Sequence, residues 1–386
     1  MRSCRTTSLL GLVALLGAAC ATTGQVADIK PGEKPAPESV EAGLWMRMER
    51  LEEQIQTSGR LERDAELNAY LRGIVCKLAP DYCADIRISI VRAANFNASM
   101  APNGAMHVWT GLMLRSDNEA QLAYVLGHEL AHYLRRHTLK RWRDIRAKTD
   151  GLVFLQLATA MAGVGYVGSI AQIAALGSVF AFSRDQEREA DRLGFEMMRE
   201  AGYDPQEAVK IWDLLLAEKE AAEEPDKLIF FSTHPAAEER GATLADLAAE
   251  FDGGPAIIDR GRFVAATSRF RTGWLRDEVR ERDFARMEVL LDHLAQANIN
   301  PAELHFFRGE LYRLRGEDDD RSKAAAAYEE ALKLGEAPPE THRALGLVYW
   351  SMERSKDARE AFETYLRQDP GAEDRAMIES YIQQIQ

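Results

Sequence analysis

The chain has 386 residues, of which 46% are apolar and 28% charged, so it is long enough for two or more domains and is neither disordered nor collagen-like in composition. Its 48 Lys and Arg face 61 Asp and Glu, and the resulting net charge of −13 argues against a phosphate-binding surface. We therefore expect a globular, multidomain protein without a nucleic-acid partner.

The N-terminal segment has the pattern of an export signal. Residues 1–19 combine basic residues, a short apolar run and small residues before Cys20, and the run is too short for a permanent membrane span. This arrangement resembles a bacterial lipoprotein box, so Cys20 either carries lipid or simply follows a cleavage site, and Ala21 beside it resembles the outer-membrane sorting pattern. We expect a signal peptide over 1–19, a lipid-anchored tether over 20–43, and a periplasmic protein held at the outer membrane.

Two cysteines remain beyond the signal. Cys76 and Cys83 are separated by six residues, and Pro80 and Asp81 between them favour a turn. In an oxidising compartment such a pair closes a small loop, so we expect a disulfide. The alternative is two buried free thiols.

The segment around residues 118–132 carries the strongest functional pattern. Its apolar residues recur at helical spacing after a possible cap at Asn118, which places His128 and His132 on one face of a helix. Two imidazoles four residues apart can share one zinc, and Glu129 projects beside them as a general base. His137 lies off this face and is expected to be a surface histidine.

A second helix downstream offers further ligands. Glu187 and Asp191 are again four residues apart, so Glu187 can be a third ligand while Asp191 supports a ligating imidazole. Two His and one Glu leave one coordination position for water. The alternative for this charged run is a solvated helix face.

These patterns, together with Asn97-Ala98-Ser99-Met100-Ala101-Pro102-Asn103-Gly104, resemble the M48 family of zinc endopeptidases. The resemblance implies an α+β, zincin-like metalloprotease domain that is mostly helical with a small sheet. It assigns one Zn²⁺ per chain to His128, His132 and Glu187, general-base work to Glu129 and a supporting role to Asp191.

A later stretch, Ser232-Thr233-His234-Pro235 followed by Arg240, is similar to a late motif of the same family. The resemblance implies that His234 approaches the zinc as a gate or fourth ligand in a resting state, or assists the transition state. It also implies that Arg240 helps to frame the site. Without the resemblance, His234 is a loop histidine.

Strands are predicted around the turn at 102–104. Residues 86–91 and 106–109 have strand-like composition, and we expect an edge strand near the histidine helix that pairs with an extended substrate peptide. The alternative is that these strands only form the core of the sheet.

Residues 151–183 contain no charged side chain. A single membrane crossing would place the two histidines and Glu187 on opposite sides of the bilayer, and two crossings need about 40 apolar residues. We therefore expect a helical hairpin over 151–182 that packs on the protein, with a dip into the bilayer interface as the alternative.

The C-terminal part contains a helical repeat. Leu345, Gly346, Tyr349, Ala358, Phe362 and Pro370 match the tetratricopeptide pattern, and an earlier copy with an insertion near 317–320 includes Gly309, Tyr312, Ala324, Tyr328 and Ala331. We expect a metallopeptidase domain over 44–253, a helical connector over 254–300 and an all-α domain of tetratricopeptide-like repeats over 301–386. The repeats offer a docking surface, or they only cap the protease.

The combined prediction is an exported zinc metalloendopeptidase. The resemblance implies that its substrates are misfolded or unassembled envelope proteins, with the repeats docking substrate or the outer-membrane assembly machinery. The alternatives are a chaperone-like assembly adaptor whose zinc site is latent, and an inner-membrane protease.

Overall fold

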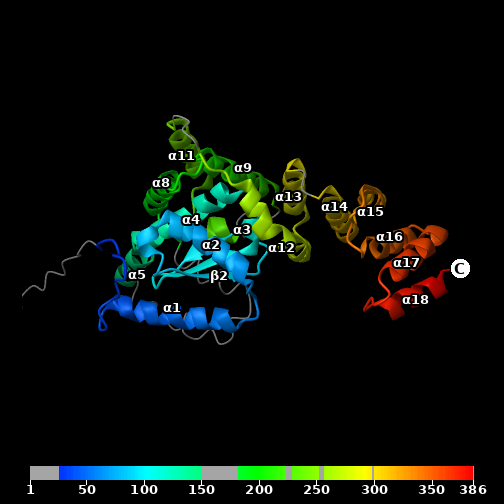
Figure 1. The fold of residues 1–386 in the computed structure, drawn as a ribbon, viewed down its shortest axis with the longest axis horizontal. Helices are drawn as coiled ribbons and strands as arrows, with labels where there is room; N and C mark the ends of the chain where they lie inside the picture. The colour runs from blue at the N-terminus through cyan, green and yellow to red at the C-terminus, as the bar shows by residue number, and fades with distance from the viewer. Residues whose placement is uncertain (1–25, 149–180, 223–227, 252–255, 298–299, 386) are drawn as a thin grey trace, which may run out of the picture.

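The computed structural model describes residues 26–148, 181–222, 228–251, 256–297 and 300–385 (Figure 1). The predicted signal peptide, Cys20 and nearly all of the predicted hairpin at 151–182 lie outside these residues. The elements in chain order are α1 (Val40–Thr57), β1 (Leu61–Glu62), α2 (Ala65–Leu78), η1 (Pro80–Tyr82), β2 (Arg87–Val91), β3 (Ala98–Met100), β4 (Ala105–Trp109), α3 (Thr110–Arg115), α4 (Glu119–Leu134), α5 (His137–Lys148), α8 (Arg184–Glu200), α9 (Gln206–Ala221), α10 (Ile229–Thr233), α11 (Ala237–Ala249), α12 (Arg260–Glu281), α13 (Phe284–Gln296), α14 (Pro301–Arg315), α15 (Asp320–Leu334), α16 (Thr341–Ser351), α17 (Ser355–Gln368) and α18 (Arg375–Gln384).

The predicted architecture, mostly helical with a small sheet, is confirmed. The four strands have the order β1-β2-β4-β3, in which β2 and β4 are parallel and the two outer pairs are antiparallel. The strand predicted at 86–91 is therefore internal, and β3 forms the edge beside α4. The cause is the β3–β4 hairpin, whose second strand inserts between β2 and β3.

Gly104 closes that hairpin. Its φ is +85°, and a Cβ atom there would lie 2.3 Å from the carbonyl oxygen of Asp85. Only glycine fits this close approach, which lets β4 run alongside β2.

Helices cover both faces of the sheet. Figure 1 shows α2 and α4 on one side and α1 on the other. The side facing α1 is partly polar: Gln56 donates to Ser89, and Ser99 and His107 are paired across β3 and β4. The opposite side packs against α2 and α4 and forms the apolar core.

His107 makes the stability of the fold depend on pH. Burial lowers the pKa of this imidazole to about 4, although Glu52 nearby acts in the opposite direction. The unfolded chain, with a histidine pKa near 6.5, therefore takes up a proton between pH 6.5 and 4 that the folded chain does not. The stabilisation is complete above pH 6.5 and is lost as the pH falls towards 4.

We expect this one group to remove about 2 kcal/mol of unfolding free energy between pH 7 and pH 5. Urea unfolding of the wild type and of His107→Gln, which stays neutral, measures the difference between their pH slopes. Equal slopes would show that His107 is not the group responsible.

The helices after the sheet extend one continuous core. α8 and α9 pack on α4, whereas α12 and α13 pack against α3 and α9. The predicted connector at 254–300 therefore contributes two helices to this core. Among the helices in the described ranges, none is both long enough and apolar enough to cross a membrane.

The C-terminal helices extend away from the sheet as two hairpins, α14–α15 and α16–α17, followed by α18 (Figure 1). Each hairpin closes on a glycine. A Cβ atom on Gly309 would lie 2.4 Å from the Tyr328 ring, and one on Gly346 would lie 2.6 Å from the Phe362 ring. The helices of each pair thus approach closely because an aromatic ring occupies the space above a glycine.

The segment before α1 is packed against the protein. Ile29 is buried, its N–H donates to the carbonyl of Leu134, and its own carbonyl accepts from Tyr82. A disulfide joins Cys76 to Cys83 and holds the turn that carries Tyr82. Residues 26–39, predicted as tether, thus contact the end of the histidine helix, and α1 begins before position 44.

Candidate metal centre

Helix α4 carries the histidine pair. Its first turn is capped by Asn118, whose side chain accepts from the N–H of Gln121. Its apolar residues embed the helix in the core, and both His128 and His132 are buried. Their Nε2 atoms lie 3.0 Å apart.

Helix α8 brings the carboxylates. It begins with a capping box in which Ser183 and Gln186 satisfy each other's backbone N–H groups. Glu187 and Asp191, one turn apart, are both fully buried against α4. The carboxylate oxygens of Glu187 lie 3.6 Å from Nε2 of each histidine.

Two glycines allow this close approach of α4 and α8. A Cβ atom on Gly194 would lie 2.7 Å from the backbone nitrogen of His128, and one on Gly127 would lie 3.1 Å from the Gly194 carbonyl oxygen. The backbones of the two helices therefore touch at this point. The side chains of His128, His132, Glu187 and Asp191 lie beside this contact. The sequence contained both glycines, but their pairing is visible only once the helices cross.

Gly194→Ala is expected to force α8 away from α4. Overpacking of this kind costs about 1–3 kcal/mol of unfolding free energy. We also expect weaker zinc binding, because Glu187 moves with the helix while the histidines stay. Competition with a chromophoric chelator measures the zinc affinity, and denaturant unfolding measures stability.

Gly73→Ala is the matched control. This glycine lies within α2, and a Cβ atom there meets no atom within 4 Å. It should raise stability by up to about 1 kcal/mol through helix propensity and leave zinc affinity unchanged. Unchanged zinc affinity in Gly194→Ala would contradict the role given to the helix contact.

The donor set fits zinc. His128, His132, Glu187 and His234 each offer one ligand atom, and these atoms all lie within 4.8 Å of one another. Zinc–ligand bonds of about 2.0–2.2 Å in a tetrahedron place the ligand atoms about 3.3–3.6 Å apart. The separations of 3.0 and 3.6 Å between the atoms of His128, His132 and Glu187 are close to this.

Asp191 supports His128. One carboxylate oxygen lies 2.9 Å from Nδ1 of His128 and also accepts from the Tyr124 hydroxyl at 2.9 Å. Arg240 donates to both oxygens of Asp191, at 2.7 and 2.8 Å, and lies 2.7 Å from Glu187. Burial opposes ionisation, but the guanidinium keeps the pKa of Asp191 well below its usual range. Asp191 therefore stays charged and orients the imidazole.

His137 supports the other histidine, and the prediction of a surface residue is wrong. It is fully buried, with Nδ1 2.9 Å from Nδ1 of His132 and Nε2 3.1 Å from a Glu189 oxygen. Burial lowers the pKa of His137 to about 4, so the ring is neutral at pH 7. α4 ends at Leu134 and the chain turns before His137, which a helical projection does not anticipate.

His137→Ala is expected to weaken zinc binding 10- to 100-fold, the usual effect of removing the group that orients a metal-bound imidazole. His137→Gln, whose amide can accept from His132 and donate to Glu189, should restore most of this affinity. Zinc titration of both variants provides the measurement. Equal losses in the two would indicate that His137 acts only by filling space.

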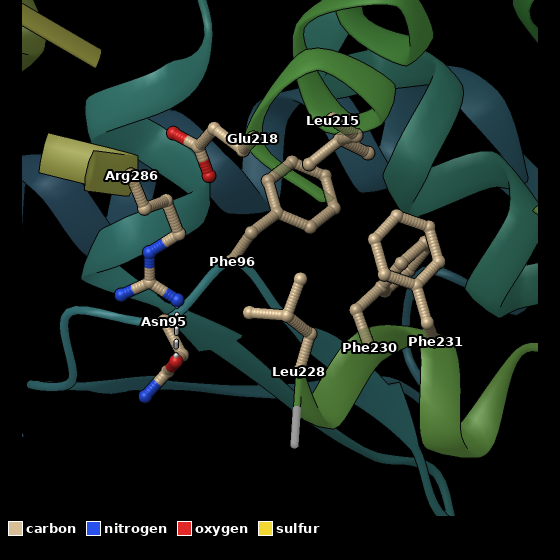
Figure 2. Close-up of a pocket in the computed structure, with 8 residues that line it drawn as sticks. All are labelled: Asn95, Phe96, Leu215, Glu218, Leu228, Phe230, Phe231 and Arg286. Carbon is tan, nitrogen blue, oxygen red and sulfur yellow. Dashed lines mark hydrogen bonds between the residues drawn. The ribbon is translucent and has the colours of Figure 1, made fainter. Parts of the chain in front are cut away.

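Aromatic rings enclose His132 and His234. Phe182 stacks on His132 with ring centroids 3.8 Å apart, and Phe230 stacks on His234 at 4.9 Å. Figure 2 shows Phe230 in the wall of a small cavity, beside Phe231. The contact of Phe182 with His132 joins two segments far apart in the sequence and could not be expected from it. Phe230 lies four residues before His234 in the same helical turn, so helical spacing could have indicated that contact.

Glu129 faces the ligand cluster from α4. It is buried, one of its carboxylate oxygens has no hydrogen-bond partner among the described residues, and burial raises its pKa. Nε2 of His234 lies 3.5 Å from that oxygen. A buried carboxylate beside a metal-binding cluster is suited to accept a proton from water.

A helix with two histidines and an intervening glutamate, completed by a carboxylate from a second helix, defines a domain of the metallopeptidase class. Residues 61–248 match Peptidase family M48, and the chain therefore carries an M48 domain.

Similar proteins include three proteases. The Beta-barrel assembly-enhancing protease of Escherichia coli (strain K12) is 28% identical over 204 residues, which cover 50% of this chain and 40% of that protein. Metalloprotease LoiP of the same strain is 30% identical over 167 residues, 42% of this chain and 62% of that protein. Mitochondrial metalloendopeptidase OMA1 of Schizosaccharomyces pombe is 32% identical over 154 residues, 40% of this chain and 44% of that protein. The matched part therefore spans less than two thirds of each relative.

Proposed function

We propose that the protein is a zinc-dependent endopeptidase of the cell envelope, which hydrolyses misfolded or unassembled envelope proteins. The observation that carries the proposal is the buried group of His128, His132 and Glu187 with Glu129 beside it. The similarity to a protease whose name refers to β-barrel assembly supports the choice of envelope substrates.

The proposed chemistry assigns a role to each side chain. Zinc, when bound by His128, His132 and Glu187, supplies a Lewis acid that polarises the scissile carbonyl. Glu129 accepts the proton of the attacking water and returns it to the leaving amine. Asp191 and His137 hold the two imidazoles in the orientation that ligation requires.

Substrate is proposed to bind as an extended strand along β3. This strand is the edge of the sheet beside α4, and within the described residues it pairs only with β4. A peptide held through main-chain hydrogen bonds is selected for being unfolded more than for its sequence. Misfolded proteins meet that requirement.

His234 is proposed to control access to the site. Its Nδ1 lies 3.1 Å from Glu187 and 3.4 Å from Nε2 of His128, where a fourth ligand would sit. This position also favours the second candidate, a chaperone-like assembly adaptor with a latent zinc site. Movement of His234 away from the ligand cluster would convert the latent adaptor into the active endopeptidase.

The C-terminal hairpins are proposed to be tetratricopeptide-like repeats that dock substrate or the outer-membrane assembly machinery. The two glycine–aromatic contacts, Gly309 with Tyr328 and Gly346 with Phe362, support the repeat assignment. Lipid on Cys20 is proposed to hold the protein at the periplasmic side of the outer membrane.

Metal removal tests the proposal. The chain from residue 21 onward, incubated with an unfolded outer-membrane protein, should cleave it, lose cleavage with a chelator and regain it with one equivalent of zinc. The adaptor candidate predicts suppressed aggregation with no new peptide ends, both with zinc and after His234→Ala. Cleavage that survives complete zinc removal would overturn the metallopeptidase proposal.

A further inference from the structure

Helix α5 is basic in an acidic protein. Its sequence, HTLKRWRDIRAK, contains five Lys or Arg against one Asp, while the whole chain carries −13. Its apolar side, with Leu139 and Trp142, is buried against Leu44 and Met48 of α1. The helix therefore has one face fixed to the protein and another that carries cations.

Three of these cations have no carboxylate partner. Lys140, Arg141 and Arg143 form no ion pair with any residue that the structure describes; Arg143 is exposed, whereas Lys140 and Arg141 are partly buried. Nearby carboxylates are already paired, since Glu41 and Glu33 contact Arg136 and Asp28 contacts Arg135. Asp144 is the one acid on the helix itself. In a chain with excess acid, cations on one helix that are unpaired among the described residues indicate an anionic partner outside that part of the chain.

The packed N-terminal segment leads directly to this helix. Val26 packs against the cluster that contains Leu139 and Trp142, and Figure 1 shows the start of the described chain beside α5. Ile29 is fixed to the end of α4 by its hydrogen bond to Leu134. The first described residue is therefore held at α5 and cannot swing to another part of the surface.

Chain length completes the geometry. Six residue steps separate Cys20 from Val26, which is a reach of at most about 20 Å when extended. If Cys20 carries the proposed lipid, the membrane surface lies within that distance of α5. Phospholipid headgroups are then the closest large source of negative charge.

We infer that the cationic face of α5 binds the anionic phospholipid surface of the membrane and orients the protease on it. The orientation argument rests on the proposed lipidation of Cys20, whereas the lipid contact itself requires only Lys140, Arg141 and Arg143. This placement also fixes the position of the metal centre relative to the membrane, because α4 ends where the N-terminal segment is fixed.

Vesicle sedimentation tests the inference without the anchor or the peptidase activity. The chain from residue 21, carrying Glu129→Gln, is mixed with vesicles of phosphatidylethanolamine and phosphatidylglycerol at 3:1, or with phosphatidylcholine vesicles alone. We expect binding to the anionic vesicles, little to the neutral ones, and release at high salt.

Replacing Lys140, Arg141 and Arg143 together by Gln should reduce affinity for the anionic vesicles about 100-fold, since each cation near a membrane contributes about fivefold. The matched control replaces Arg199, Arg321 and Lys356 by Gln, which changes net charge equally on α8 and the C-terminal helices. Its affinity should stay within about twofold of the parent.

Several outcomes would overturn the inference. Equal binding of the α5 variant and the parent, or equal binding to neutral and anionic vesicles, would exclude an electrostatic lipid contact. A variant that keeps vesicle binding but loses affinity for an acidic unfolded polypeptide would assign the face to substrate. Zinc content equal to that of the parent verifies that each variant is folded.

Discussion

Glu129→Gln is expected to abolish peptide hydrolysis while the protein keeps its zinc. The substitution preserves the size of the side chain but removes the group that accepts a proton, and general-base catalysis contributes about 10²- to 10⁴-fold to rate. Zinc content should remain at one per chain, because the ligand group consists of His128, His132, Glu187 and, when it is close, His234. The measurement pairs metal analysis with turnover of an unfolded envelope protein.

Glu196→Gln provides the control for this experiment. Glu196 is an exposed carboxylate on α8, the helix that carries Glu187, and its loss should change neither zinc content nor rate. Unchanged turnover in Glu129→Gln would sink the assignment of the general base. Loss of zinc in the same variant would instead mean that Glu129 belongs to the metal shell.

The part of the site that can be predicted from sequence is the part that one helix determines. His128, Glu129 and His132 lie within five consecutive positions, so helical geometry alone fixes their relative placement. Glu187 could be proposed because it lies on a second helix with its own periodic pattern. Its distance to the histidines depended on the crossing of α4 and α8.

The rest of the site required contacts between segments. Gly194 permits the crossing, and its role depends on a backbone 67 positions earlier in the chain, at Gly127. His137 becomes a support for His132 only because the chain turns after α4. Phe182 reaches His132 from the end of a segment whose sequence indicates only that it is apolar.

The order of the strands in the sheet could not be predicted, for a similar reason. The strands at 86–91 and 106–109 were predicted from composition, but composition does not specify which strand is at an edge. The insertion of β4 between β2 and β3 decides this, and it depends on Gly104. The ion pairs that join α12 to the protease were also hidden, because their members are far apart in sequence.

Arg115→Met is expected to destabilise the protein by about 3–5 kcal/mol, the range seen when one partner of a buried ion pair is removed. Arg115 is fully buried, and its guanidinium donates to Glu218 on α9 at 2.8 Å and to Glu278 on α12 at 3.0 Å. Without it, Glu218 keeps no cation within hydrogen-bonding distance among the described residues, whereas Glu278 still contacts Arg286. Denaturant unfolding of the whole chain measures the loss.

Adding Glu218→Gln to Arg115→Met should recover part of this stability, because the double variant no longer buries an uncompensated charge. Arg92→Met is the matched control, since Arg92 pairs with Asp277 on the same helix α12 but is about half exposed. Its loss should cost less than about 1 kcal/mol.

Glu218 and Arg286 line the same cavity as Phe230, the ring stacked on His234 (Figure 2). Disruption of the Arg115 ion-pair network should therefore weaken the packing of α12 and also the lining of the cavity at Phe230. Equal stability losses in the Arg115 and Arg92 variants would show that the buried ion-pair network is not what holds α12 against α3 and α9.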